Sequence, residues 1–260
     1  MNQFFSIKRF LMLFKKHTVE NYKTYFMSVG VLAGLLLLII GFVSSSSFGQ
    51  LSEKTQTDFF ISFLLISGSI FTSIIFADLG NKKKAIPVLT LPSSHFEKYL
   101  ANWLYTFLIF QIFFVAVFYL ILAIVINLWP HTFTGLRNTY LNVFSTEKQA
   151  YVAFIIYPFL HAVVFLGAIH FEKLHFIKTA FTLFIGVFLL EIINQLILSA
   201  MIDRTIIGTS IFSPIHIRNE YQYVTIKAYS IKNYEEGIVL GLVIMILWIC
   251  AYFRLKEKEV

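Results

Sequence analysis

Cysteine and charge are both scarce in this 260-residue sequence. Its one cysteine, Cys250, cannot form an intrachain disulfide, and a zinc site built from several thiolates is excluded. Charged residues make up 13% of the chain, against roughly 25% in a typical soluble domain. An ordinary water-soluble surface is therefore excluded.

Several motifs of nucleotide-binding and hydrolytic enzymes are also missing. The sequence has no G-x-x-x-x-G-K-[ST] phosphate loop, no G-x-S-x-G elbow, no H-E-x-x-H and no Rossmann glycine pattern. The chain therefore cannot hydrolyse ATP by a phosphate-loop mechanism on its own. We expect that it is not an enzyme, and that if ATP drives its activity, a partner chain hydrolyses the ATP.

Apolar residues dominate the sequence and come in long blocks. They make up 58% of the chain, and charged clusters separate the blocks. A helix that spans a bilayer needs about 20 mostly apolar residues. Six blocks meet this length, which predicts an all-α polytopic membrane protein with six transmembrane helices at about 26–44, 59–78, 100–128, 151–170, 177–201 and 237–254.

The predicted spans form one transmembrane domain, residues 25–254. In residues 1–24 before it, an apolar stripe recurs at helical spacing between lysines: Phe4, Ile7, Leu11 and Phe14, with Lys8 and Lys15. This pattern predicts an amphipathic helix that lies in the headgroup plane. The alternative is a basic tail that only sets topology. Two loops, 79–99 and 203–236, and a tail, 255–260, complete the chain.

Basic residues give the chain a net charge of +7. They lie beside apolar blocks, without the aromatic-basic pattern of single-strand binders, so membrane lipids and not nucleic acid are the expected partner. Lys and Arg are retained on the cytoplasmic side of membrane proteins. With six spans, 14 of them fall on the side of the two termini and 7 on the other. Both termini are therefore expected in the cytoplasm.

The segment before span three carries a helix start signal. Glu97 follows Ser94 at the spacing of a capping box, in which each side chain accepts a backbone N–H. Pro92 keeps the preceding chain extended. A helix is therefore expected to begin near His95 and to run into span three. The alternative is an ordinary capped helix in a loop that only connects two spans.

The same segment resembles a known family. Leu91-Pro92-Ser93-Ser94, followed by Glu97-Lys98 ahead of span three in a six-span chain, looks like the type-2 permeases of ATP-binding-cassette (ABC) transporters. In that family a separate ATPase subunit docks onto this loop. The resemblance implies that one short segment couples the ATPase to span three: Pro92, Ser93, Ser94, His95, Phe96, Glu97 and Lys98.

The resemblance also implies partners and a location. Two six-span permease subunits, identical or different, would assemble with ATPase subunits that bind ATP and Mg, so this chain is expected to bind no cofactor. The family resemblance favours a bacterial exporter in the cell (inner) membrane. The chain departs from the family in its segment from Asp203 to Glu236, which is long and polar where the family has short re-entrant half-helices. Tyr221 to Tyr229 partly alternates polar and apolar residues and predicts a small strand element there.

Glu191 lies near the middle of span five, where an ionised carboxylate would cost roughly 2.5–3.5 kcal/mol. Asn194 and Gln195 follow at helical spacing, so all three share one face that is expected to point into the bundle. The functional interpretation is a polar patch in a substrate path or subunit contact. The alternative is hydrogen bonding between helices with no role in transport.

Three histidines gather around the end of span four: His161, His170 and His175. Their spacing fits no familiar metal-ligand motif, so no metal site is expected. Tyr157, Pro158 and His161 are instead expected to kink span four and hydrogen-bond it to its neighbours.

Two other functions stay open from the sequence. One is a membrane-embedded enzyme, such as a protease or a lipid-modifying transferase, that uses Glu191 with His161 or His170. Such a site needs its groups within hydrogen-bond reach of one another, and nothing in the sequence brings them together. The other is a non-catalytic membrane anchor or sensor whose output is the loop 203–236.

Overall fold

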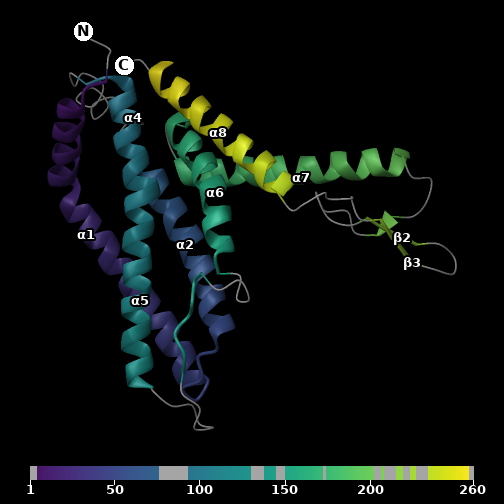
Figure 1. Ribbon diagram of the computed structural model, residues 1–260, viewed down its shortest axis with the longest axis horizontal. Coiled ribbons are helices and arrows are strands. Elements are labelled where there is room, and N and C mark those ends of the chain that lie inside the picture. Colours follow the sequence, from purple (N-terminus) through teal and green to yellow (C-terminus); the bar gives the residue numbers. More distant parts are fainter. Residues whose placement is uncertain are drawn as a thin grey trace.

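Apolar helices make up most of the computed structural model (Figure 1). It describes residues 5–75, 93–129, 138–144, 150–171, 174–201, 206–207, 215–218, 223–226 and 234–257. The helices are α1 (Ile7–Ser46), α2 (Glu53–Ile75), α4 (His95–Trp103), the π-helical turn η2 (Leu104–Ile109), α5 (Phe110–Leu128), α6 (Val152–His170), α7 (His175–Met201) and α8 (Tyr234–Glu257). Six are long and apolar enough to cross a membrane, with α4, η2 and α5 counted as one. The chain is a multi-pass membrane protein with six α-helical spans, as predicted.

The largest difference from the predicted boundaries is at α1. This single helix runs through 40 residues, so the expected boundary between an interfacial helix 1–24 and a separate span is not a helix end. The predicted position of residues 1–24 in the headgroup plane stays a prediction. The expectation that a helix begins near His95 and runs into span three is confirmed, because α4 starts at His95 and continues without a break through η2 into α5.

The buried side of α1 differs from the predicted apolar stripe. Phe14 stacks on Tyr105 of η2 with ring centroids 4.6 Å apart, and Tyr105 Oη donates to the Phe14 carbonyl oxygen at 3.2 Å. Ile7 and Leu11 are exposed, and Phe4 lies outside the described residues. Contacts with η2 therefore decide which side of α1 is buried.

Two apolar clusters form the core. The first joins α1, α2, α5 and α6, and its fully buried members include Leu36, Ile40, Phe60, Leu64, Phe114, Phe118 and Tyr157. The second joins α4, α6 and α8 through Tyr99, Phe165, Ala168, Ile169, Ala251 and Leu255. Because α6 contributes to both clusters, it is the central helix of the fold (Figure 1).

Two glycines let α6 pack closely against its neighbours. A Cβ atom on Gly68 of α2 would overlap the Tyr157 ring, and one on Gly167 of α6 would lie 2.6 Å from Thr179 Cγ2. Small residues permit such close approach between membrane helices. Gly68 therefore fixes the contact between α2 and α6, and Gly167 fixes the start of α7 against α6.

A buried amide ties the loops together at the start of α2. Gln56 Nε2 donates to the carbonyl oxygens of Leu51, at 3.0 Å, and Thr139, at 2.8 Å. Its Oε1 accepts from the Leu141 backbone N–H at 2.9 Å. Buried backbone groups outside helices need such partners. The segment that follows α5 is therefore held against the loop between α1 and α2.

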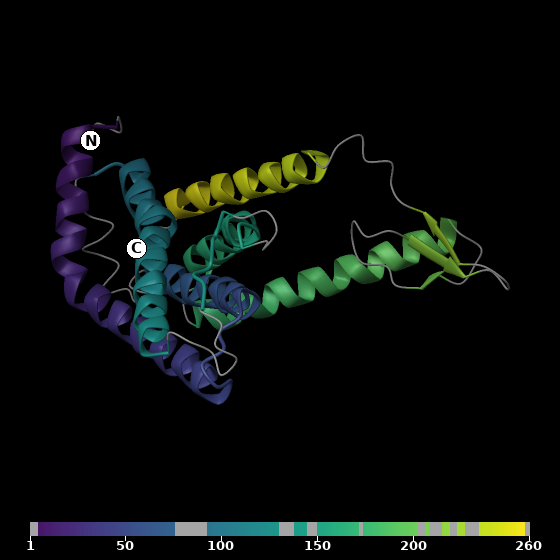
Figure 2. The same ribbon diagram turned by 60° about the horizontal axis from the view of Figure 1, so that its bottom comes forward.

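Helix α7 leaves the other helices and ends beside a small sheet (Figures 1 and 2). Of its side chains, only His175 and Thr179 are buried, both in its first turns. The sheet consists of β1 (Ile206–Ile207), β2 (Ile215–Arg218) and β3 (Tyr223–Ile226), which pair antiparallel in that order. The strand element predicted within 221–229 is confirmed at β3.

Candidate functional site

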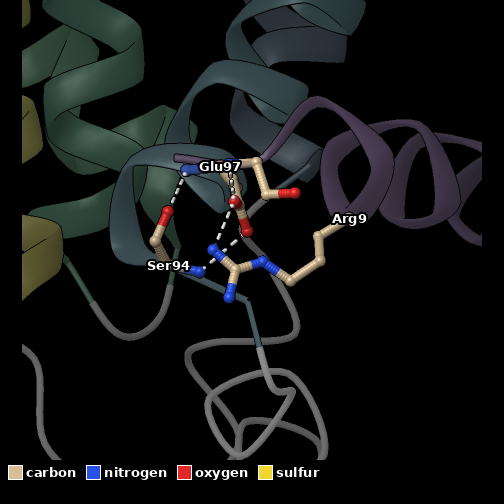
Figure 3. Close-up of polar contacts among 4 residues, drawn as sticks. Arg9, Ser94 and Glu97 are labelled. Atoms are coloured by element: carbon tan, nitrogen blue, oxygen red, sulfur yellow. Dashed lines mark hydrogen bonds and ion pairs between the residues drawn. The ribbon is translucent and has the colours of Figure 1, made fainter. Parts of the chain in front are cut away.

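The start of α4 is a capping box, as predicted. Ser94 Oγ accepts from the Glu97 backbone N–H at 3.1 Å, and Glu97 Oε2 accepts from the Ser94 backbone N–H at 2.9 Å (Figure 3). Ser94 has the extended backbone of an N-cap residue. The two bonds satisfy backbone donors that the first turn leaves unpaired. The start of α4 is therefore fixed by its own sequence.

Glu97 also binds the start of α1. Its Oε1 accepts from the Ser6 backbone N–H at 2.8 Å and from Arg9 Nη2 at 3.1 Å. Figure 3 shows the Arg9 and Ser94 groups converging on this carboxylate. The Glu97 side chain is fully buried, whereas that of Arg9 is 30% exposed. We call Ser6, Arg9, Ser94 and Glu97 the clasp.

Two members of the predicted coupling segment, Glu97 and Lys98, do not lie on an exposed surface, because both are buried. A carboxylate is stable in such a place because charged and backbone N–H donors replace its lost hydration. Glu97 therefore joins two parts of this chain and is not available to a partner.

Phe96 is the exposed member of the predicted coupling segment. Its side chain is 44% exposed, and its ring meets those of Phe5 and Tyr252 edge-on, with centroids 5.8 and 6.0 Å away. His95 and Ser93 are half-buried. Pro92 lies outside the described residues. The starts of α1 and α4 and the end of α8 therefore meet around one exposed aromatic ring.

The part of α4 that follows the clasp, together with η2, connects the clasp to the middle of the bundle. Tyr99 Oη donates to the Trp248 carbonyl oxygen of α8 at 2.9 Å, and the π-helical turn η2 is continuous with α4 and α5. The Phe110 backbone N–H bonds to the Tyr105 carbonyl oxygen, five residues back. π-Helical turns inside α-helices are frequent at functional sites.

A buried hydrogen-bonded node surrounds η2. His161 of α6 lies 2.9 Å from Thr106 Oγ1 through Nε2, and its Nδ1 accepts from Trp248 Nε1 at 3.3 Å. Tyr157 Oη donates to the Thr106 carbonyl oxygen at 2.7 Å. Because indole nitrogen only donates, Nδ1 must accept, and the proton of neutral His161 lies on Nε2. The node joins η2, α6 and α8.

The predicted hydrogen-bonding role of Tyr157 and His161 is thus confirmed, while their partners Thr106 and Trp248 were missed. Pro158 lies inside α6, which remains a continuous helix. Within the described parts of the chain, no group of three His, Cys, Asp or Glu side chains could hold a metal ion. Both His161 nitrogens already have protein partners, so this ring is fixed as a structural hydrogen-bonding group.

No protein-family model, curated protein or solved structure matches the chain. Its geometry is therefore the basis for proposing a function.

The polar face of α7 does not point into this chain's bundle. Glu191 and Gln195 are exposed and Asn194 is half-buried, and they lie beyond the first turns of α7, which hold its only buried side chains within the described residues. The expectation that all three face into the bundle is therefore wrong for a single copy of the chain. In the described residues, no hydrogen bond or ion pair joins Glu191 to His161 or His170. The structure does not assemble the residues of the alternative membrane enzyme.

Proposed function

We propose that the chain is the membrane-spanning permease subunit of an ABC transporter, an exporter driven by a separate ATPase subunit that binds ATP and Mg. The observation that supports this most is the unbroken helix from the clasp through η2 into α5. Its start is pinned by the capping box and by α1. A force applied near Phe96 would therefore move span three and α1 together.

The end of the molecule that holds the clasp has the properties of a docking surface. Interfaces need an apolar anchor, often aromatic, surrounded by polar groups. Phe96 offers a partly exposed ring beside His95, and the clasp behind it keeps the backbone rigid. A partner that binds Phe96 and moves would therefore move the helix that continues into span three. ATP binding would then shift the population between two arrangements of the spans.

Phe96→Ala is the sharpest test of docking, because Phe96 is exposed and lies beside the clasp rather than in it. We expect the variant to accumulate normally in membranes and to lose roughly tenfold in ATPase affinity during purification in mild detergent. Phe144→Ala, which removes another exposed ring, is the matched control. Failure to recover an ATPase with the unmodified chain would refute the proposed class. Full binding by Phe96→Ala would refute only this contact.

A substitution of Glu97 is unsuitable as a docking test. The Glu97→Arg change would place a second cation beside Arg9 and leave the Ser6 and Ser94 backbone donors without their acceptor. Loss of ATPase binding would then follow from damage to the fold. Glu97 belongs among tests of stability.

In the proposed orientation the chain lies in the inner membrane of the cell, and both of its termini are in the cytoplasm. Six spans put the start of α1 and the end of α8 on one side, and Phe96 contacts Phe5 and Tyr252 from these two ends. Single cysteines at Lys8 and Lys54, both exposed, test this in a Cys250→Ser background. We expect an impermeant thiol reagent to label Lys54→Cys in intact cells and Lys8→Cys only after permeabilisation. The reverse pattern would invert the topology.

A second permease subunit, identical or different, is part of the same proposal. The polar face of Glu191, Asn194 and Gln195 has no partner within the described chain, and polar side chains in a membrane favour hydrogen bonds with another helix. Crosslinking through Gln195→Cys in native membranes is expected to give a dimer. A monomer at all protein densities would argue against pairing through this face.

A further inference from the structure

Helix α1 is too long to be a span alone. Its 40 residues extend about 60 Å at 1.5 Å per residue, against a hydrocarbon core of about 30 Å. Lys and Arg occur only before Thr24, and none lies between Thr24 and Ser46. About the first half of α1 therefore lies outside the hydrocarbon core.

The outward side of this first half mixes lysines with apolar side chains. We call it the basic-apolar face and define it by Lys8, Leu11, Met12, Lys15, Val19 and Lys23, all exposed. Leu11, Met12 and Val19 are 58%, 56% and 62% exposed. The opposite side is held in place by the clasp and by the stacking of Phe14 on Tyr105. The outward direction of the face is thus fixed by contacts.

The basic residues of the basic-apolar face differ from the other basic residues of α1 in whether they form ion pairs. Arg9 pairs with Glu97, and Lys16 pairs with Glu20 at 3.6 Å. Within the part of the chain that the structure describes, Lys8, Lys15 and Lys23 form no ion pair with an acidic side chain. They lie seven and eight residues apart, about two helical turns or 10–12 Å. Each ammonium group can therefore meet a different anion.

The apolar residues between these lysines indicate which kind of molecule carries the anions. Water alone would leave Leu11, Met12 and Val19 unfavourably exposed, whereas a headgroup layer accepts apolar side chains below and lysine ammonium groups above. Seven residues after Val19, the same side reaches Phe26, which is 80% exposed and begins the apolar half of the helix. The face therefore leads continuously into the membrane.

We propose that the basic-apolar face of α1 binds the surface of a bilayer through anionic phospholipid headgroups. Each lysine near an anionic membrane surface strengthens binding by about fivefold. Lys8, Lys15 and Lys23 bind the headgroup phosphates, while Leu11, Met12 and Val19 enter the layer beneath them. This inference concerns lipid selectivity and does not depend on an ATPase partner.

Quenching of a local fluorophore by brominated lipids tests the proposal. A dye on Met12→Cys, in the Cys250→Ser background, reports on the face, and a dye on Val31→Cys reports on the apolar half of α1. The protein is placed in vesicles of phosphatidylcholine and phosphatidylglycerol with one or the other lipid brominated. At position 12 we expect phosphatidylglycerol to be preferred by about fivefold at low salt, and less at high salt. At position 31 the two lipids should quench equally.

Two triple variants separate charge from folding. Changing Lys8, Lys15 and Lys23 to Gln is expected to abolish the preference at position 12 and leave quenching at position 31 unchanged. Changing the same residues to Arg should keep the preference. Absence of lipid quenching at position 12 would overturn the proposal, because the face would then be covered by protein or water. An unchanged preference in the Gln variant would overturn it as well.

Discussion

Glu97 and Glu191 are two carboxylates of membrane helices in opposite environments. Glu97 is fully buried and accepts from Ser6, Arg9 and Ser94. Glu191 is exposed and lies beyond the first turns of α7, where His175 and Thr179 are buried. The first is satisfied within one chain and the second is not. Glu97 therefore stabilises the fold of this chain, whereas any partner of Glu191 comes from outside the described residues.

Removal of the buried carboxylate should have the largest effect. Glu97→Ala removes the carboxylate that accepts from Arg9 and from two backbone N–H groups, and we expect a loss of roughly 3 kcal/mol in the free energy of unfolding. Unfolding in mixed detergent and SDS micelles measures it. Glu20→Ala, which removes the exposed i,i+4 partner of Lys16, should cost less than about 0.5 kcal/mol. Equal losses in the two variants would mean that the clasp contributes nothing special.

The start and the free part of α7 should respond differently to added volume. Gly167→Val inserts side-chain atoms where Thr179 already lies, and we expect a loss of about 2 kcal/mol. Gly186→Ala adds a methyl group with nothing within 4 Å and should change stability little or raise it slightly. The same unfolding measurement compares them. A tolerant Gly167→Val would show that α7 is not anchored on α6.

The node around η2 should give a smaller effect. Trp248→Phe removes the indole donor to His161 while keeping an aromatic ring, and a loss of about 1 kcal/mol is expected. His161→Phe should cost more, because both Thr106 and Trp248 lose a partner. A double-mutant cycle measures their coupling. Additive losses would show that the two side chains act independently.

The smallest effect is expected at Glu191. Glu191→Gln keeps the shape of the side chain and breaks no contact in the described chain, so unfolding of the dilute protein should not change measurably. Glu191→Lys is expected to accumulate less in membranes, since a cation has no acidic partner nearby on α7. A stability change in Glu191→Gln that disappears on dilution would reveal a contact between copies.

Much of the fold follows from local sequence. Spans are predictable because each needs about 20 apolar residues, and the capping box is predictable because Ser94 and Glu97 lie within one helical turn. Hydrogen bonds between residues that are far apart in the sequence are not predictable in this way. Arg9, for example, lies 88 residues from Glu97. Residues 76–92, which include Pro92 of the predicted coupling segment, fall outside the described residues.

The surroundings of the polar residues differ from expectation in opposite ways. Glu97 was expected to contact an ATPase because its segment resembles the coupling loop of the permease family, yet the start of α1 lies against it. Glu191 was expected inward because carboxylates avoid lipid, yet this rule does not say which chain supplies the partner. His161 was assigned correctly, because a histidine inside an apolar span needs hydrogen bonds whatever its function.

The π-helical turn η2 has a consequence for relatives of this chain. A π turn holds one residue more than an α turn, so it is what a helix forms when a single residue is inserted and both flanking halves keep their packing. Here α4 is tied to α1 and α8, and α5 belongs to the other core cluster. Homologous chains one residue shorter between Trp103 and Phe110 should therefore have a regular α-helix at this point, with both halves still in place.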